Sequence, residues 1–184
     1  MELSFVQAPV TGILDGLRAG NYDAICSPLP EKQYKAEDLA ASIPFTAYRQ
    51  VLVLHGKKKI FASDDWTGMR FGARKESRGL EAIAAISGVS AQPYDTVEQA
   101  MEDLFIEALD GVVCEEPVAL YFVKTRYRGR LKMAGYMAQD PKRPVRVIML
   151  RGNIEKLEAL NRGLEAIKAR RIDKELEKKW FSRR

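Results

Sequence analysis

The chain has 184 residues, of which 46% are hydrophobic and 30% charged, which excludes a disordered or fibrous protein and fits one domain or two small lobes. Its apolar runs are of strand length and fall short of the roughly 18 residues that a membrane helix needs. The formal net charge is +5, and the basic excess lies in residues 151–184. Acidic residues are interleaved there, so we interpret this segment as a solvated helix face and expect no nucleic-acid partner.

The small number of cysteine and histidine residues argues against metal or nucleophilic chemistry. Cys26 and Cys114 are predicted to be small buried residues of two strands. His55, the one histidine, follows an apolar strand and is interpreted as the end of that strand. Because no Ser-His-Asp or Cys-His motif surrounds it, we predict no catalytic residue, no metal site and no cofactor.

The first part of the chain predicts strands at 2–7, 23–26 and 50–54, and a helix at 9–20. Pro9 suits the first turn of that helix because a helix start needs no amide hydrogen there. Gly20 ends the helix, since glycine accepts the left-handed conformation without strain.

Strands and helices alternate through the rest of the chain. The expected elements are a strand at 70–73, helices starting after Ser77 and at Val97, a strand at 111–114, a helix starting at Pro117, a strand at 145–150, and terminal helices through 154–167 and 172–180. Ile172, Leu176 and Trp180 recur at a spacing of four, which predicts that the last helix docks through an apolar stripe. The alternation indicates an α/β protein with mostly parallel sheets.

An internal repetition suggests two lobes. The order helix, tight turn, aspartate and strand occurs before Cys26 and again before Cys114, and a proline follows each strand (Pro28 and Pro117). Since the chain then returns, we expect residues 1–49 to form the first part of lobe 1, residues 50–141 to form lobe 2, and residues 142–184 to complete lobe 1. A cleft between the two lobes is expected.

Five segments carry a resemblance to a known family: GLRAGNYDAI (16–25), SIPFTAYRQVLVL (42–54), WTGMRFGARKES (66–77), YDTVEQAMEDL with ALDGVVCEEPVALYFV (within 94–123), and NRGLEAIKARRIDKELEKKWF (161–181). Together they resemble the type 2 periplasmic solute-binding proteins, family 3, the polar amino-acid-binding components of ABC transporters. The resemblance implies a two-lobed fold that grips a small polar or anionic solute by hinge closure, without chemistry. It also implies a periplasmic or extracellular location and ABC transporter membrane subunits as partners.

The resemblance and the local sequence together nominate three residues of lobe 2. Ser77 lies at a helix start with Arg78 beside it, which suits a carboxylate, although Ser77 is equally a common helix cap. Glu115 stands where the family usually places the acid for the solute ammonium. Glu116 could instead cap the helix opened by Pro117, so that the two acids split these roles.

The resemblance also places Lys32, Ser27 and Phe45 of lobe 1 among the ligand-binding residues. Lys32 stands where the family has a carboxylate-binding arginine, and a lysine cannot form the bidentate guanidinium contact. In addition, Glu76 replaces the usual glycine before Ser77, and Arg78 replaces a small hydroxyl residue. The standard amino-acid pose is therefore in question, and a different small anion or polar solute is an alternative.

The family begins with a strand and a helix ahead of the segment that matches residues 2–7, and this chain lacks them. We expect a truncated chain, a degenerate family member, a homodimer, or a partner that donates the strand, because an unpaired sheet edge is otherwise exposed. Two functional alternatives stay open. The first is a sensory ligand-binding domain of the same fold. The second is a cyclohexadienyl (prephenate or arogenate) dehydratase, for which Glu115 or Lys32 could supply the acid or base.

Overall fold

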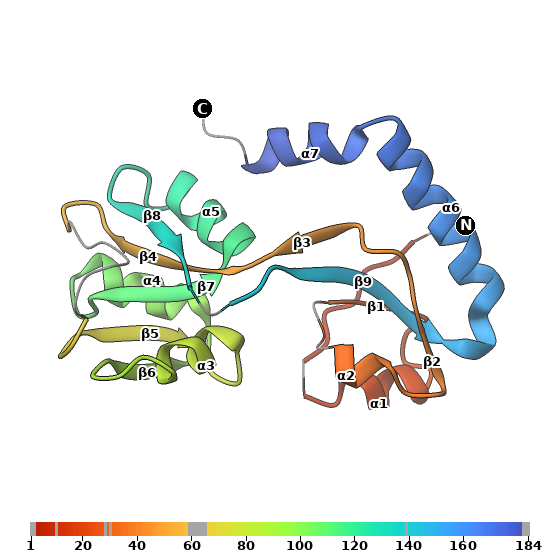
Figure 1. Cartoon of the computed structure of the whole chain (residues 1–184), viewed down its shortest axis with the longest axis horizontal. Helices are drawn as coiled ribbons and strands as arrows, with labels where there is room; N and C mark the ends of the chain where they lie inside the picture. Colours follow the sequence, from red (N-terminus) through yellow and green to blue (C-terminus); the bar gives the residue numbers. More distant parts are fainter. Residues whose placement is uncertain are drawn as a thin grey trace. The chain divides into compact units, whose positions relative to one another are not determined.

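Figure 1 shows the computed structural model, which describes residues 3–9, 11–27, 29, 31–58, 66–138 and 140–181. The chain divides into two compact units. Unit 1 comprises Met1–Ala47 and Arg143–Leu176, and unit 2 comprises Tyr48–Lys142 and Glu177–Arg184. Each unit has its own sheet, and each is described by itself below. The lobe boundaries expected from the sequence stay predictions.

The sheet of unit 1 is built around one long strand, β9 (Arg143–Leu150). β1 (Ile25–Ser27) and β2 (Leu39–Ala41) pair with it on either side, both antiparallel, and β3 (Thr46–Tyr48) also pairs with it. Two short helices, α1 (Ile13–Arg18) and α2 (Glu31–Tyr34), belong to the same unit (Figure 1). The core consists of buried aliphatic side chains, namely Leu17, Ile25, Leu29, Leu39 and Ile148.

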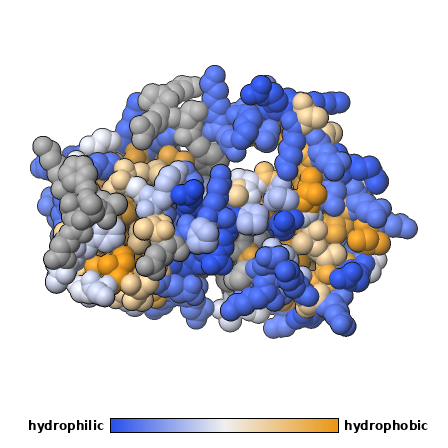
Figure 2. Space-filling view, in the orientation of Figure 1, coloured by the Kyte–Doolittle hydropathy of each residue, from blue (hydrophilic) through white to orange (hydrophobic). Residues whose placement is uncertain are grey.

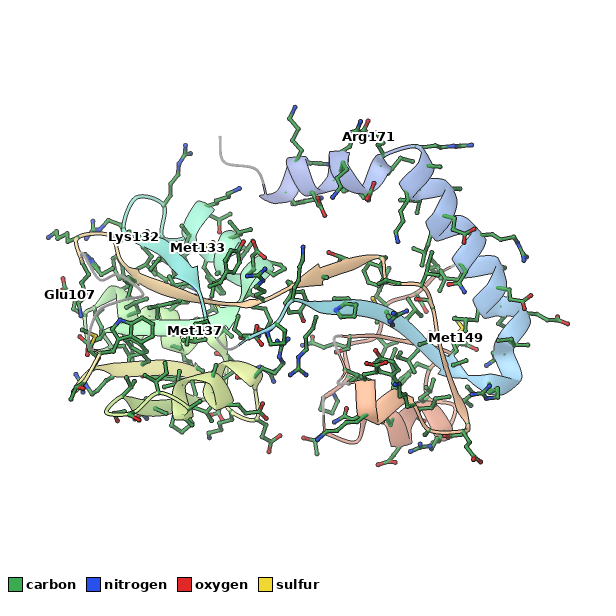
Figure 3. The ribbon with its side chains drawn as sticks, in the orientation of Figure 1. Glu107, Lys132, Met133, Met137, Met149 and Arg171 are labelled. Carbon is green, nitrogen blue, oxygen red and sulfur yellow. The ribbon has the colours of Figure 1, made fainter. Side chains whose placement is uncertain are left out.

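The C-terminal region of the chain is helical, as predicted. A 3-10 turn (Arg151–Asn153) leads into α6 (Ile154–Ala169), and α7 (Ile172–Phe181) follows Arg171, whose φ of 59° breaks the helix at the position labelled in Figure 3. The predicted apolar docking stripe is wrong, because Leu176 is 48% exposed and Trp180 is 63% exposed. Figure 2 shows mostly hydrophilic side chains over α6 and α7 in this view.

Unit 2 contains a five-stranded sheet in the order β6-β5-β7-β4-β8. Its strands are β4 (Gln50–His55), β5 (Arg70–Arg74), β6 (Ser90–Tyr94), β7 (Gly111–Glu115) and β8 (Leu131–Tyr136). β5 runs parallel to β6 and β7, whereas β4 runs antiparallel to β7 and β8. The α/β class is confirmed, but the sheets are mixed rather than mostly parallel, because β4 and β9 run against their neighbours.

Three helices pack on the sheet of unit 2: α3 (Arg78–Ala84), α4 (Val97–Phe105) and α5 (Glu116–Lys124). Successive side chains of β4 point to opposite faces, as in any strand. Val51 and Val53 join the core formed with α4 and α5, and Leu52 and Leu54 join the core formed with α3. β4 is therefore buried on both faces and is the centre of the unit.

Several sequence expectations fail at short or unpaired segments. Residues 3–7 form no strand, and Phe5 is 91% exposed; Glu2 lies outside the described residues. A strand needs a neighbour for its amide and carbonyl groups, and no strand among the described residues pairs with this segment. The short strands β2 and β3 and the strands β6 and β8 were not predicted. Cys26 lies in β1 as expected but is exposed, while Cys114 is buried.

None of the helices in the described part of the chain is long and apolar enough to cross a bilayer.

We expect Leu54→Ala to lower the free energy of unfolding by about 2–5 kcal/mol, because the side chain is fully buried and its removal leaves a cavity. Ile106→Ala is the matched control, since Ile106 is 68% exposed and its truncation should change that free energy by less than about 0.5 kcal/mol. Urea denaturation of both variants measures the difference. Equal losses would contradict the assignment of β4 as the core strand.

Candidate functional site

Polar residues gather at one edge of the sheet of unit 2. The parallel strands β5 and β7 end at Arg74 and Glu115, and the antiparallel strand β4 begins at Gln50, which is paired with Glu115. In open α/β sheets, ligands bind outside the carboxyl ends of the parallel strands. This edge is therefore the candidate site of the unit.

Ser77 caps α3. Its Oγ accepts a hydrogen bond from the amide of Leu80 at 3.3 Å, and its hydroxyl donates to the carbonyl oxygen of Arg74 at 2.6 Å. Ser77 is also buried. The capping alternative is thus realised in the geometry, and the hydroxyl proton is already engaged by the protein. A direct contact between Ser77 and a solute stays a prediction.

Arg78, the next residue, is held by a carboxylate from a distant part of the chain. Its Nη2 forms an ion pair with Asp140 Oδ1 and lies 3.4 Å from the carbonyl oxygen of Pro141. Asp140 Oδ2 in turn accepts a hydrogen bond from the amide of Gln50 at 2.6 Å. The Nε and Nη1 atoms of Arg78 are buried and have no hydrogen-bond partner among the described residues. The guanidinium therefore retains N–H donors that no other described group of the protein uses.

Gln50 lies beneath the first turn of α3. Its side chain is fully buried, and within the described part of the chain neither its amide nitrogen nor its amide oxygen has a partner. A Cβ at Gly79 would lie 2.6 Å from the carbonyl oxygen of Val113 and 3.2 Å from Gln50 Oε1. The close approach of α3 to β7 thus requires glycine at position 79.

Tyr48 interacts electrostatically with Arg78 and Asp140. Burial raises the pKa of its phenol, and the negative charge of Glu115 raises that pKa further, while the positive charges of Arg78 and Arg74 oppose the change. The Tyr48 hydroxyl therefore stays protonated at neutral pH and can donate a hydrogen bond. We call the residues Tyr48, Gln50, Arg74, Arg78, Glu115 and Asp140 the polar cluster.

The two neighbouring glutamates have different surroundings. Glu115 ends β7 and precedes α5 without a side-chain capping bond. The predicted alternative that Glu116 caps this helix is wrong, because Glu116 lies inside the first turn and its Oε1 accepts from the hydroxyl of Tyr136 at 2.7 Å. This hydrogen bond raises the pKa of Tyr136. Of the two, Glu115 is the acid that belongs to the polar cluster.

The structure places the other three nominated residues in unit 1. Ser27 ends β1, Lys32 is an exposed residue of α2, and Phe45 is half-buried, with its amide donating to the carbonyl oxygen of Val145 at 3.1 Å. Their part in solute binding stays a prediction. Pro28, expected to follow the strand, lies outside the described residues.

His55 lies at the opposite end of β4 from Gln50. It is buried, its Nε2 is 3.9 Å from Glu107 Oε1, and its Nδ1 faces the amide of Lys57 at 3.4 Å. Figure 3 labels Glu107, whose φ is 64°.

Burial raises the pKa of the Cys114 thiol, which disfavours the reactive thiolate. Within the described ranges, no group of three or more His, Cys, Asp or Glu residues could hold a metal ion.

Sequence reasoning missed four members of the polar cluster: Tyr48, Gln50, Arg74 and Asp140. A signal existed for Gln50, because a glutamine at the head of the apolar run VLVL falls on a buried strand. Asp140 gave no comparable signal, since it lies in the polar segment between β8 and β9 and meets its partners only in the folded chain.

The profile of the bacterial extracellular solute-binding proteins, family 3, matches residues 1–183. The chain therefore belongs to this family, and its fold is that of the two-lobed periplasmic binding proteins, as expected from the sequence. No curated protein matches the chain significantly.

Solved structures show the same fold at low sequence identity. The substrate-binding protein of an amino acid ABC transporter is 21% identical with a TM-score of 0.79, over 99% of this chain and 81% of that one. A binding component of an ABC transporter from Wolinella succinogenes, complexed with lysine, is 17% identical with a TM-score of 0.83, over 99% and 79%. An ancestral amino-acid-binding protein, described as a precursor of cyclohexadienyl dehydratase, is 17% identical with a TM-score of 0.74, over 97% and 77%.

We expect Gly79→Ala to lower the free energy of unfolding by about 1–3 kcal/mol, because the new methyl group overlaps the carbonyl oxygen of Val113. Gly163→Ala in α6 is the matched control. Its Cβ would meet no atom within 4 Å, so the substitution should stabilise the chain by about 0.5–1 kcal/mol through helix propensity. Thermal or urea denaturation gives both values, and a neutral Gly79→Ala would show that α3 is not held as described.

Proposed function

We propose that the chain binds a small polar solute of the amino-acid class for ABC-type import, by hinge closure and without covalent chemistry. The observation that carries this proposal is the guanidinium of Arg78, whose buried Nε and Nη1 have no partner in the described part of the chain. Arg78 and Glu115 both influence the pKa of Tyr48. Family membership supports the general class of activity.

An α-amino acid carries a carboxylate and an ammonium group, and the polar cluster offers a counterpart for each. The N–H donors of Arg78 suit the carboxylate, because a guanidinium binds a carboxylate through parallel hydrogen bonds. Glu115 suits the ammonium group, and the protonated Tyr48 hydroxyl supplies a further donor. The amino acids that the similar structures bind, lysine among them, fall in the same chemical class.

Binding is favoured over catalysis by the composition of the cluster. The one histidine of the chain lies at the far end of β4 from Gln50, so this edge of the sheet has no imidazole for proton transfer. The likeness to a dehydratase precursor keeps a dehydratase as the second candidate, with Glu115 as its acid or base. A sensory binding domain would use the same cluster and differ only in its partner.

A periplasmic or extracellular location and a membrane transporter as partner are part of the proposal and rest on the family. The homodimer or strand-donating partner expected from the sequence stays a prediction.

Thermal unfolding with L-glutamine, L-glutamate, L-arginine or L-lysine tests the proposal. A solute at 100 times its dissociation constant should stabilise the native state by about 2.7 kcal/mol. The recovered solute should be chemically unchanged, whereas release of phenylpyruvate from prephenate would favour the dehydratase.

Glu115→Gln should weaken the best solute of this panel at least about tenfold, because an amide cannot pair with the ammonium charge. Glu81→Gln is the matched control, since Glu81 is an exposed residue of α3 outside the polar cluster. Calorimetric titration measures both affinities. Absence of binding by the whole panel, or full affinity in Glu115→Gln, would contradict the proposal.

A further inference from the structure

Asp140 joins parts of unit 2 that are far apart in the sequence. Its carboxylate pairs with Arg78 at the start of α3 through one oxygen and accepts the amide of Gln50 at the start of β4 through the other, at 2.6 Å. Both oxygens are thus engaged, and the Asp140 side chain is only 7% exposed. A buried carboxylate with two such contacts holds its partners in fixed positions.

These contacts lie next to the points where the chain enters and leaves unit 2. Gln50 follows closely after the Ala47–Tyr48 boundary, and Asp140 shortly precedes the Lys142–Arg143 boundary. The backbone strengthens the link, because the amide of Met137 donates to the carbonyl oxygen of Gln50 at 3.0 Å and the amide of Asp140 donates to that of Met137 at 3.2 Å. Figure 3 labels Met137, directly after β8.

The ion pair uses only one side of the guanidinium. Nη2 points to Asp140, and Nε and Nη1 are left without a partner among the described residues. An ion pair with a purely structural role would be expected to use more of the five N–H donors of a buried arginine. The arrangement instead keeps the remaining donors in a fixed orientation and withheld from other protein groups.

The carboxylate also balances the charge of the polar cluster. The ion pair between Asp140 and Arg78 is neutral by itself. The pKa of Tyr48 responds to this pair and to Arg74 and Glu115, so these four groups together carry no formal net charge. Without Asp140, the same groups would carry a formal excess of one positive charge. A cluster without net charge favours a zwitterionic solute, because an additional charge on the solute would gain no long-range attraction from it.

We propose that Asp140 positions Arg78 for the solute carboxylate and, by cancelling the arginine charge, selects neutral zwitterionic amino acids over anionic ones. This inference rests on the function proposed above and names the solute class and a positioning residue for the same site. Asp140 itself contacts no solute in this scheme and acts through Arg78.

The test compares L-glutamine with L-glutamate, which are nearly the same size and differ by one charge. Calorimetric titrations of the full chain and of Asp140→Asn should show the ratio of glutamate to glutamine affinity rising about tenfold in the variant, because the cluster gains a positive charge. Asp95→Asn is the matched control. Its carboxylate pairs with Lys75 at the surface of the same unit, outside the polar cluster, so this variant should leave the ratio unchanged.

If Asp140→Asn does not fold, as judged by circular dichroism, Arg74→Gln provides a second test. This substitution makes the cluster negative by one charge, so the affinity for L-arginine relative to L-glutamine should rise about tenfold. An unchanged ratio in the folded variant tested, or an equal change in Asp95→Asn, would overturn the proposal while the proposed function stands. Failure of the original chain to bind any of these solutes would overturn both.

Discussion

The antiparallel insertion of β4 between β7 and β8 is the constraint on which the rest of unit 2 depends. β4 is buried on both faces, so its side chains belong to two cores and a slip of one residue would exchange them. The pairing of Gln50 with Glu115 therefore fixes where the strand begins. It also places Gln50, the polar first residue of β4, at the edge of the sheet where the parallel strands β5 and β7 end.

Burial of the polar cluster has an energetic cost that the surrounding core must offset. Each buried donor or acceptor without a partner costs about 1–3 kcal/mol, and Gln50 and Arg78 each contribute two such atoms. Native stabilities are only about 5–15 kcal/mol, so such a group of atoms is uncommon in a region with a purely structural role. This cost is one physical argument for the binding role that we propose for this end of the sheet.

The sequence predicted well those elements whose side chains follow a strong period. β4, β5 and β7 were expected from their apolar runs, and α4 and α6 from their helical spacing. Elements without a period were missed. β6 carries Pro93 at the edge of its sheet, and β2 and β3 are too short to show alternation. Residues 3–7 alternate, but no strand in the described part of the chain pairs with them.

The sequence by itself determined the α/β class, the family resemblance, and the helix start at Ser77 and Arg78, because periodicity and helix starts depend on neighbouring residues. The nomination of Glu115 came from the family resemblance. Only the tertiary structure decided what these residues do to one another. Ser77 is a cap, Arg78 is paired with Asp140, and Glu115 faces the start of β4 rather than capping a helix. The pairing of Arg78 with Asp140 depends on which distant segments the fold brings together. A local sequence pattern cannot predict a contact between positions so far apart.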